Sequence, residues 1–133
     1  MRIIIALTLT AAVGATSALS KPSLRDVATV EEGLFVIAVA DKIRKECGSI
    51  SGRVLKAMSQ MQQLNSFAQD QGYSSTEIKT YVNSDVEKTR MKAKRDAYLT
   101  NQGVVKSDPS TYCAAGRAEI QKSSRIGALL RAR

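Results

Sequence analysis

Five basic side chains lie within eight residues of one predicted helix, and they are the strongest candidates for a binding site in the sequence. They are Lys88, Arg90, Lys92, Lys94 and Arg95. At helical spacing Lys88, Lys92 and Arg95 share one face, with Arg90 and Lys94 beside it. Such a cluster is typical of a surface that binds an anionic partner. A solvated helix face is the alternative, and the sequence leaves both interpretations open.

The charge balance limits the class of partner. After the first twenty residues the chain has nineteen basic and twelve acidic side chains, a net charge of +7, which favours acidic partners. No aromatic residue alternates with the basic ones, as base stacking would require, and an exported protein does not meet chromosomal DNA. We therefore expect no nucleic-acid partner. The remaining classes are an anionic component of the cell envelope, such as phospholipid headgroups or acidic polymers, and an acidic protein.

Residue types that carry out catalysis are scarce. The chain has no histidine, which removes the commonest general base and the commonest transition-metal ligand. Cys47 and Cys113 are expected to be oxidised, so that neither a thiolate nucleophile nor a zinc site remains. Glu31 and Glu32 are adjacent carboxylates, but their place in the first turn of a predicted helix favours capping over acid–base chemistry. We expect a non-enzymatic protein with no catalytic residue, metal or cofactor.

Methionines form a second candidate site. Met58, Met61 and Met91 have flexible thioether side chains, which can line a groove for unrelated apolar segments. A small periplasmic stress chaperone, or holdase, would need such a groove. At helical spacing Met58 and Met61 are also typical of an ordinary helical core, and the core is the interpretation we expect.

The first twenty residues have the layout of a secretory signal peptide. Arg2 precedes an apolar stretch, residues 3–13, and small residues precede an expected cut between Ser20 and Lys21. About twenty apolar residues are needed to cross a bilayer, so this stretch is too short for a retained transmembrane anchor. The mature chain, residues 21–133, is expected to form one domain and to be periplasmic or secreted.

The two cysteines predict one disulfide bond. An exported chain meets an oxidising compartment, where Cys47 and Cys113 would close a loop of about 67 residues. Chain entropy gives such a loop about 4 kcal/mol of stabilisation, comparable with the net stability of a small domain. Free thiols or a redox pair are the alternatives, but the C-x-x-C spacing typical of a redox pair is absent.

An apolar stretch, Leu34–Ala40, is expected to form the central helix around which the others pack. It contains no charge, so a helix made of it is apolar on all sides and is normally buried on several. A stripe at helical spacing continues it to Ile43 and Cys47. We therefore expect the cysteine at the end of this helix to hold a distant segment against it.

Capping signals and periodicity set the other helix boundaries. Thr29 with Glu32 fits a capping box, and Gly48 fits a left-handed helix end. Ser74 with Glu77 forms a second capping box. The expected helices are Val30–Cys47, Ile50–Gln71, a third from the second box to about Asn101 with a bend at Asn83–Asp85, and a fourth that starts at Pro109 behind Asp108.

These elements predict an all-α fold: a small, bundle-like domain of four to five helices with one disulfide, preceded by a cleavable signal peptide. Gly116 and Gly127 interrupt helical sequence, where each costs about 1 kcal/mol relative to alanine. We expect their missing side chains to permit close packing. A last apolar turn near Leu129 should dock onto the domain before the chain frays at Arg131.

Structural signals along the chain also carry a resemblance. They are the signal-like start, Cys47, Gly72–Ser74, Glu77–Ile78, Tyr81–Val82 and the ending from Cys113 to Arg131. Together they resemble a domain-of-unknown-function family of small exported bacterial proteins with about this length and two cysteines. The resemblance covers nearly the whole chain. It implies no reaction, ligand or catalytic residue, so no functional role is carried over.

Overall fold

The structure, a computed structural model, describes residues 20–133. The predicted signal peptide lies outside these residues, except for Ser20. The elements are the short 3-10 helix η1 (Leu24–Asp26), α1 (Ala28–Glu46), β1 (Ile50–Gly52), α2 (Val54–Asp70), α3 (Ser75–Asn83), α4 (Asp85–Asn101), α5 (Pro109–Gln121), the 3-10 helix η2 (Gly127–Leu129) and β2 (Leu130–Ala132). The predicted all-α fold is therefore confirmed, with one small strand pair added.

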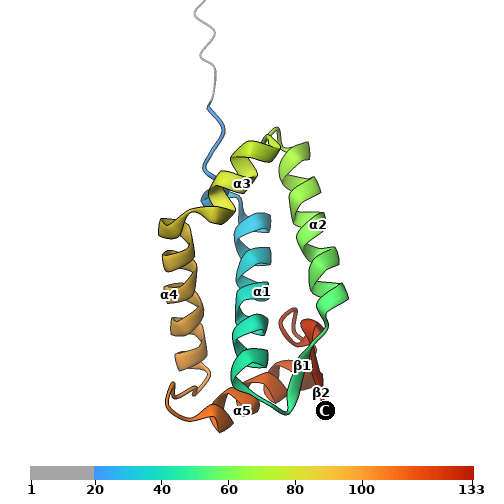
Figure 1. Ribbon diagram of the computed structural model, residues 1–133, viewed down its shortest axis with the longest axis vertical. Helices are drawn as coiled ribbons and strands as arrows, with labels where there is room; N and C mark the ends of the chain where they lie inside the picture. The colour runs from blue at the N-terminus through green and yellow to red at the C-terminus, as the bar shows by residue number, and fades with distance from the viewer. Residues whose placement is uncertain (1–19) are drawn as a thin grey trace, which may run out of the picture.

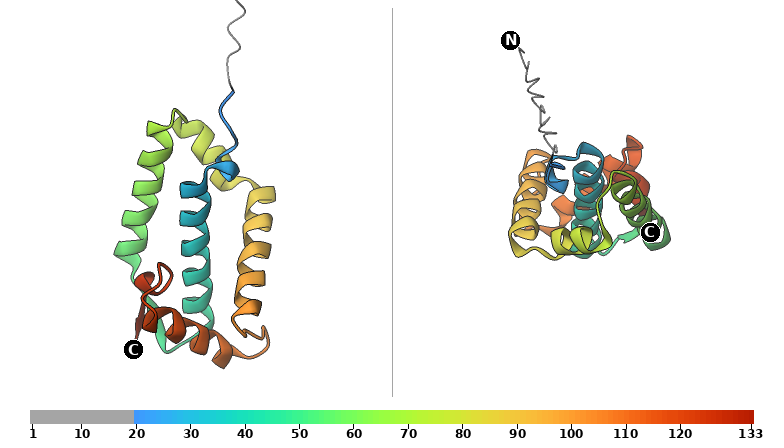
Figure 2. Two further views of the ribbon diagram at one scale, coloured as in Figure 1. Left: turned by 180° about the vertical axis from the view of Figure 1, so that it is seen from behind. Right: turned by 90° about the horizontal axis from the view of Figure 1, so that it is seen from above.

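The three long helices α2, α1 and α4 lie side by side, with α1 in the middle (Figure 1). α5 crosses the layer at the end where α1 finishes, and α3 connects α2 to α4 at the other end. The view from behind shows the same arrangement (Figure 2). No helix in residues 20–133 is both long and apolar enough to cross a bilayer.

The start of α1 differs from the prediction. The chain enters α1 directly from η1, so the helix begins at Ala28 with Val27 as its N-cap residue and without a side-chain cap. The predicted capping box of Thr29 and Glu32 is therefore wrong. The predicted left-handed Gly48 is also wrong, because the chain leaves α1 through an extended residue, Cys47.

The predicted disulfide is confirmed. Cys47 at the end of α1 and Cys113 in α5 are joined with an S–S distance of 2.03 Å. Close packing explains Gly116 in the same region, as expected from the sequence. A Cβ atom at Gly116 would lie 2.5 Å from Cδ1 of Ile50 and 2.7 Å from Cγ2 of Ile43. The disulfide and the glycine together hold α5 tightly against α1.

The segment after α1 is a strand, not the start of the second helix. Ile50 pairs with Ala132 in an antiparallel β1–β2 ladder, and α2 begins only at Val54. Ile50 and Leu130 are both buried, so apolar side chains hold the two strands in the core. The chain end does not fray, because Arg131 lies within the ladder.

The predicted third helix is two helices separated by a break. Ser84 ends α3 and also caps α4, where its Oγ accepts a hydrogen bond from the backbone N–H of Glu87 at 3.3 Å. The bend expected at Asn83–Asp85 is thus confirmed in a stronger form. The capping box of Ser74 and Glu77 at the start of α3 is also confirmed, with hydrogen bonds of 3.1 and 2.6 Å.

Two apolar clusters form the core, one toward each end of α1. The larger surrounds the disulfide and includes Ile43, Leu99 and Leu130. The smaller lies where η1, α2 and α3 meet, and includes Val30 and Tyr73. α1 passes through both clusters, as expected for the central helix.

Candidate functional site

All five predicted basic residues lie on α4, and two of them are bound to α1. Arg90 donates two hydrogen bonds to Glu31, from Nη1 to Oε1 and from Nη2 to Oε2, each 2.8 Å long. Lys94 Nζ donates to Oε1 of the same carboxylate at 2.9 Å. Glu31 is only 9% exposed, so this bidentate ion pair is better shielded from water and salt than a surface ion pair. Arg90 and Lys94 are therefore engaged within the protein.

The same contacts set the protonation state of Glu31. Hydrogen bonds from Arg90, supported by Lys94, lower the pKa of Glu31 to about 2, although burial acts in the opposite direction. Its neighbour Glu32 is exposed and approaches Arg125 instead, at 3.5 Å. The two carboxylates therefore do not share a site, as an acid–base pair would require.

The ion pair extends into a network that joins four elements. Arg90 Nε also binds Oε2 of Glu87 at 2.9 Å, and Glu87 pairs with Arg25 of η1. The hydroxyl of Tyr81 in α3 accepts a further hydrogen bond from Arg90 Nη2 at 3.2 Å. Arg90 therefore connects η1, α1 and α3 to α4, which makes its role structural.

The other three basic residues lie on a different side of α4. Lys88, Lys92 and Arg95 line a hollow between α4 and α1, next to Met91. Arg95 binds its neighbour Asp96 at 2.8 Å. Lys88 and Lys92 are exposed, and no carboxylate in residues 20–133 lies within ion-pairing distance of either. The part of the predicted cluster that remains available is thus the edge of a hollow.

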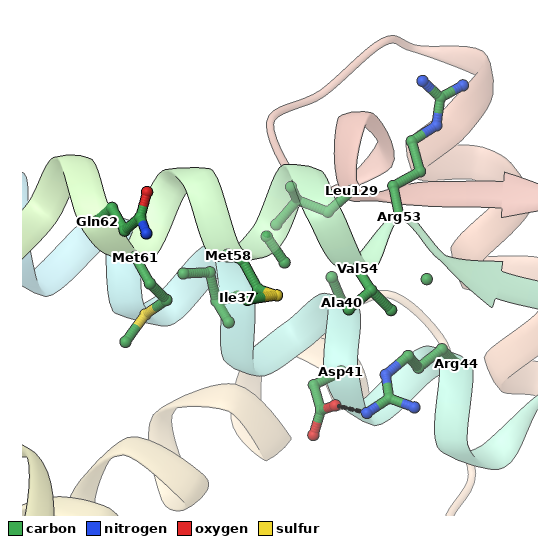
Figure 3. Close-up of a pocket in the computed structure, with 12 residues that line it drawn as sticks. Ile37, Ala40, Asp41, Arg44, Arg53, Val54, Met58, Met61, Gln62 and Leu129 are labelled. Carbon is green, nitrogen blue, oxygen red and sulfur yellow. Dashed lines mark ion pairs between the residues drawn. The ribbon is translucent and has the colours of Figure 1, made fainter.

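A larger hollow lies between α1 and the first half of α2 (Figure 3). Its volume is about 380 Å³, and apolar side chains line most of it. Ile37 and Ala40 of α1 form its floor. Val54, Met58 and Met61 of α2 form the opposite wall (Figure 3).

Three neighbouring hollows lie along one face of α1. Met61 lines both the first hollow and a second one of about 280 Å³ between α1, α2 and α3. Leu34 lines both the second hollow and the one beside α4, which measures about 240 Å³. Asp41 lines both the first hollow and the one beside α4. We call the combined site the α1 groove, defined by Leu34, Ile37, Asp41, Met58, Met61 and Met91.

The structure contradicts the expectation that Met58 and Met61 belong to the core. Their side chains are 56% and 37% exposed. Farther along α2, near the end of the helix, Leu64 and Ala68 are buried. Leu64 approaches α1 at Gly33, where a Cβ atom would lie 2.5 Å from Cδ2 of the leucine. In the first half of α2, Ala57 packs against the larger core, whereas Met58 and Met61 line the groove.

The floor of the groove was not among the predicted site residues. Leu34, Ile37 and Asp41 follow helical spacing on α1, beside the buried stripe of Val36, Ala40 and Ile43. This second stripe is the sequence signal that could have located the floor, because a helix that is apolar on all sides needs a partner on each side.

The groove has the composition of a binding site. No three side chains of His, Cys, Asp or Glu gather in residues 20–133 in a way that could hold a metal ion. Burial acts to raise the pKa of Asp41, but hydrogen bonds and charge from Lys45 and Arg44 outweigh it and lower the pKa. Asp41 is thus an ionised, already paired carboxylate. The remaining floor and walls offer apolar contact area.

Comparison with protein families identifies the family. The sequence pattern described as "Family of unknown function (DUF5333)" matches residues 22–131. The chain belongs to this family. The DUF5333 match spans all of the helices and strands described above except the last residue of β2, and it includes both cysteines. No curated protein and no solved structure matched the chain.

Proposed function

We propose that this protein is an exported, non-catalytic binding protein whose site is the α1 groove, and that its partner presents apolar groups together with negative charge. The observation that carries the proposal is the position of Lys88 and Lys92, which have no carboxylate partner in the described chain and lie beside exposed apolar side chains. Export is supported by the composition of the first twenty residues and by the Cys47–Cys113 disulfide, which an oxidising compartment favours.

Two physical effects would contribute to binding in the α1 groove. Covering exposed Met58 and Met61 removes apolar area from water, at about 25 cal/mol per Å². Methionine side chains also adapt to differently shaped partners. The lysines on the α4 edge attract an anionic partner and orient it, and this contribution weakens as salt is added.

A dye with both properties tests the proposal. 1-Anilinonaphthalene-8-sulfonate carries apolar rings and one sulfonate, and its fluorescence rises in an apolar site. We expect Met58→Gln combined with Met61→Gln to weaken dye binding about tenfold. Leu55→Gln is the matched control, because Leu55 lies on the same helix, is 84% exposed and does not line the groove. Equal losses in both variants would contradict a site in the groove.

The charged edge is tested separately. Lys88→Gln combined with Lys92→Gln should weaken dye binding at low salt, and the difference from the unmodified protein should shrink at high salt. Lys79→Gln serves as the control, because Lys79 is exposed on α3 and lies outside the three hollows. If Lys79→Gln has the same effect, the net charge of the protein attracts the dye and the edge has no specific role.

A holdase is the second candidate function, because Met58 and Met61 are exposed and flexible. A holdase binds unfolded clients through apolar contact with little regard to their charge. It should therefore suppress aggregation of a reduced model protein equally well with Lys88 and Lys92 intact or replaced by glutamine. Loss of suppression in the lysine variant would favour the charged-partner function, and no suppression at all would remove the holdase.

A further inference from the structure

The α1 groove has the length of a short helix. Its floor runs along α1 from Val30 to Arg44, which is about 21 Å at 1.5 Å per residue. α2 and α4 flank α1 on opposite sides (Figure 1). A further helix laid over the floor would therefore contact three helices at once and complete a four-helix arrangement.

The division into three hollows favours a helix over a lipid chain. A bound amphipathic helix inserts apolar side chains from successive turns into separate pockets, at positions i, i+3 or i+4, and i+7. The hollow lined by Val30 comes first along α1, and the hollows lined by Ile37 and by Ala38 follow it, one on the α2 side and one on the α4 side of the floor. An acyl chain needs a site that encloses most of its surface. The methionine wall leaves Met58 more than half exposed, so it does not provide such an enclosure.

Three of the five basic residues that line the groove lie on its α4 edge. Lys88, Lys92 and Arg95 line the α4 side. The α2 side is lined by neutral residues, including Gln62 and Asn65, apart from Arg53 at the start of α2, whose Nε donates a hydrogen bond to the carbonyl oxygen of Leu130. Acidic groups of a bound segment would therefore face α4. A second copy of this chain fits poorly, because residues 21–133 have a net charge of +7 and would bring the same lysines into the interface.

The acidic residues near the groove do not cancel this edge. Glu87 is bound by Arg25 and Arg90, and Asp41 is bound by Arg44 and Lys45. Each of these carboxylates has two basic partners of its own, so neither neutralises the lysines of α4.

We infer that the α1 groove binds an amphipathic α-helix of another protein, about four turns long, whose apolar face enters the three hollows and whose acidic edge lies against Lys88, Lys92 and Arg95. This inference rests on the proposed function and adds the shape and polarity of the bound segment.

Three synthetic peptides of about eighteen residues test it by fluorescence anisotropy with the disulfide-bonded protein. The first has leucines at helical spacing and glutamates along one edge. The second has the same composition in scrambled order, and the third has lysines in place of the glutamates. We expect the first to bind at least about tenfold more tightly than the second, and the third not to bind.

Variants locate the peptide in the groove. Met58→Gln and the double change Lys88→Gln with Lys92→Gln should each weaken binding of the first peptide about tenfold or more. Leu55→Gln and Lys79→Gln should leave it unchanged. Vesicles of anionic phosphatidylglycerol form the lipid arm, and their binding should not depend on Met58. These results together support the inference.

Other outcomes overturn the inference. Equal affinity for the ordered and scrambled acidic peptides would mean that the groove does not recognise a helix. Vesicle binding that is lost in Met58→Gln, without peptide binding, would identify a lipid ligand instead. If the anionic dye responds to groove variants while no peptide binds, the inference fails and the proposed function stands. If the dye ignores those variants as well, both fail.

Discussion

The two sides of α4 carry similar residues and use them differently. On one side Arg90 and Lys94 are bound by Glu31, which is nearly buried. On the other side Lys88 and Lys92 border the α1 groove, and the described chain offers them no carboxylate. The difference comes from α1, which presents Glu31 to the first side, whereas Asp41, which it presents to the second, is already bound by Arg44 and Lys45. Basic residues on a helix are therefore available to an external partner only where the neighbouring helix does not bind them.

The same contrast applies to the two faces of α1. One face is closed by α5, the disulfide and the larger core. The other forms the floor of the groove, where Leu34 and Ile37 remain partly exposed. The closed face should therefore supply stability, and the open face should supply binding. The following predictions test this division, from the largest effect to the smallest.

Loss of the disulfide should have the largest effect. Replacing Cys47 and Cys113 together by serine removes a cross-link between residues 66 positions apart. The free energy of unfolding should fall by about 4 kcal/mol, because the unfolded chain gains conformational freedom. Urea denaturation of the variant and of the oxidised protein measures the difference. A loss below about 1 kcal/mol would show that the closed face does not depend on this bond.

Replacing one basic residue on each side of α4 tests the contrast directly. Arg90→Gln breaks the bidentate ion pair with Glu31 and should lower the free energy of unfolding by about 2 kcal/mol. Lys92→Gln should change it by no more than about 0.5 kcal/mol, as for an exposed residue. Thermal or urea unfolding of both variants gives the comparison. Similar values for the two would mean that the sides are equivalent.

Lowering the pH should destabilise the protein on the Arg90 side of α4, because Glu31 becomes protonated. The folded-state pKa of Glu31 is about 2 and its ordinary value is 4.5, so its contribution is complete above 4.5 and is lost as the pH falls toward 2. Between these values the unmodified protein should lose about 2 kcal/mol more stability than Glu31→Gln. The readout is the free energy of unfolding measured across this range. Parallel curves for the two proteins would show that Glu31 is not held ionised.

Changes in the groove should have the smallest effect on stability. Met58→Gln should alter the free energy of unfolding by less than about 0.5 kcal/mol, because more than half of the side chain is already in water. Leu55→Gln should behave in the same way and serves as its control. If Met58→Gln alone costs more than about 1 kcal/mol, the methionine packs as part of the core and the groove is closed in solution.

Several features followed from the sequence because local chemistry decides them. The capping box at Ser74 and Glu77 and the break near Ser84 depend on residues a few positions apart. The disulfide followed from the number of cysteines and the expected compartment. The buried stripe through Val36 followed from helical periodicity.

Other features depend on partners far along the chain, which periodicity does not reveal. Ile50 continues the apolar pattern of α2, yet its pairing with Ala132 makes it a strand residue. Met58 fits the same pattern, but periodicity gives the direction of a side chain and not whether another element covers it. The engagement of Arg90 likewise depends on Glu31, which lies 59 residues away. The candidate site was therefore predicted only in part: its lysines and methionines were named, but not their common groove.

The contact between Gly33 and Leu64 determines how far α2 stands from α1. A methyl group at position 33 would overlap the leucine, so that either this side chain turns or the whole helix moves outward. Leu64 also lines the hollow between α1, α2 and α3, and either movement would change the shape of that hollow. The selectivity of the site could thus be altered at a glycine that itself lines none of the three hollows, through the spacing of two helices.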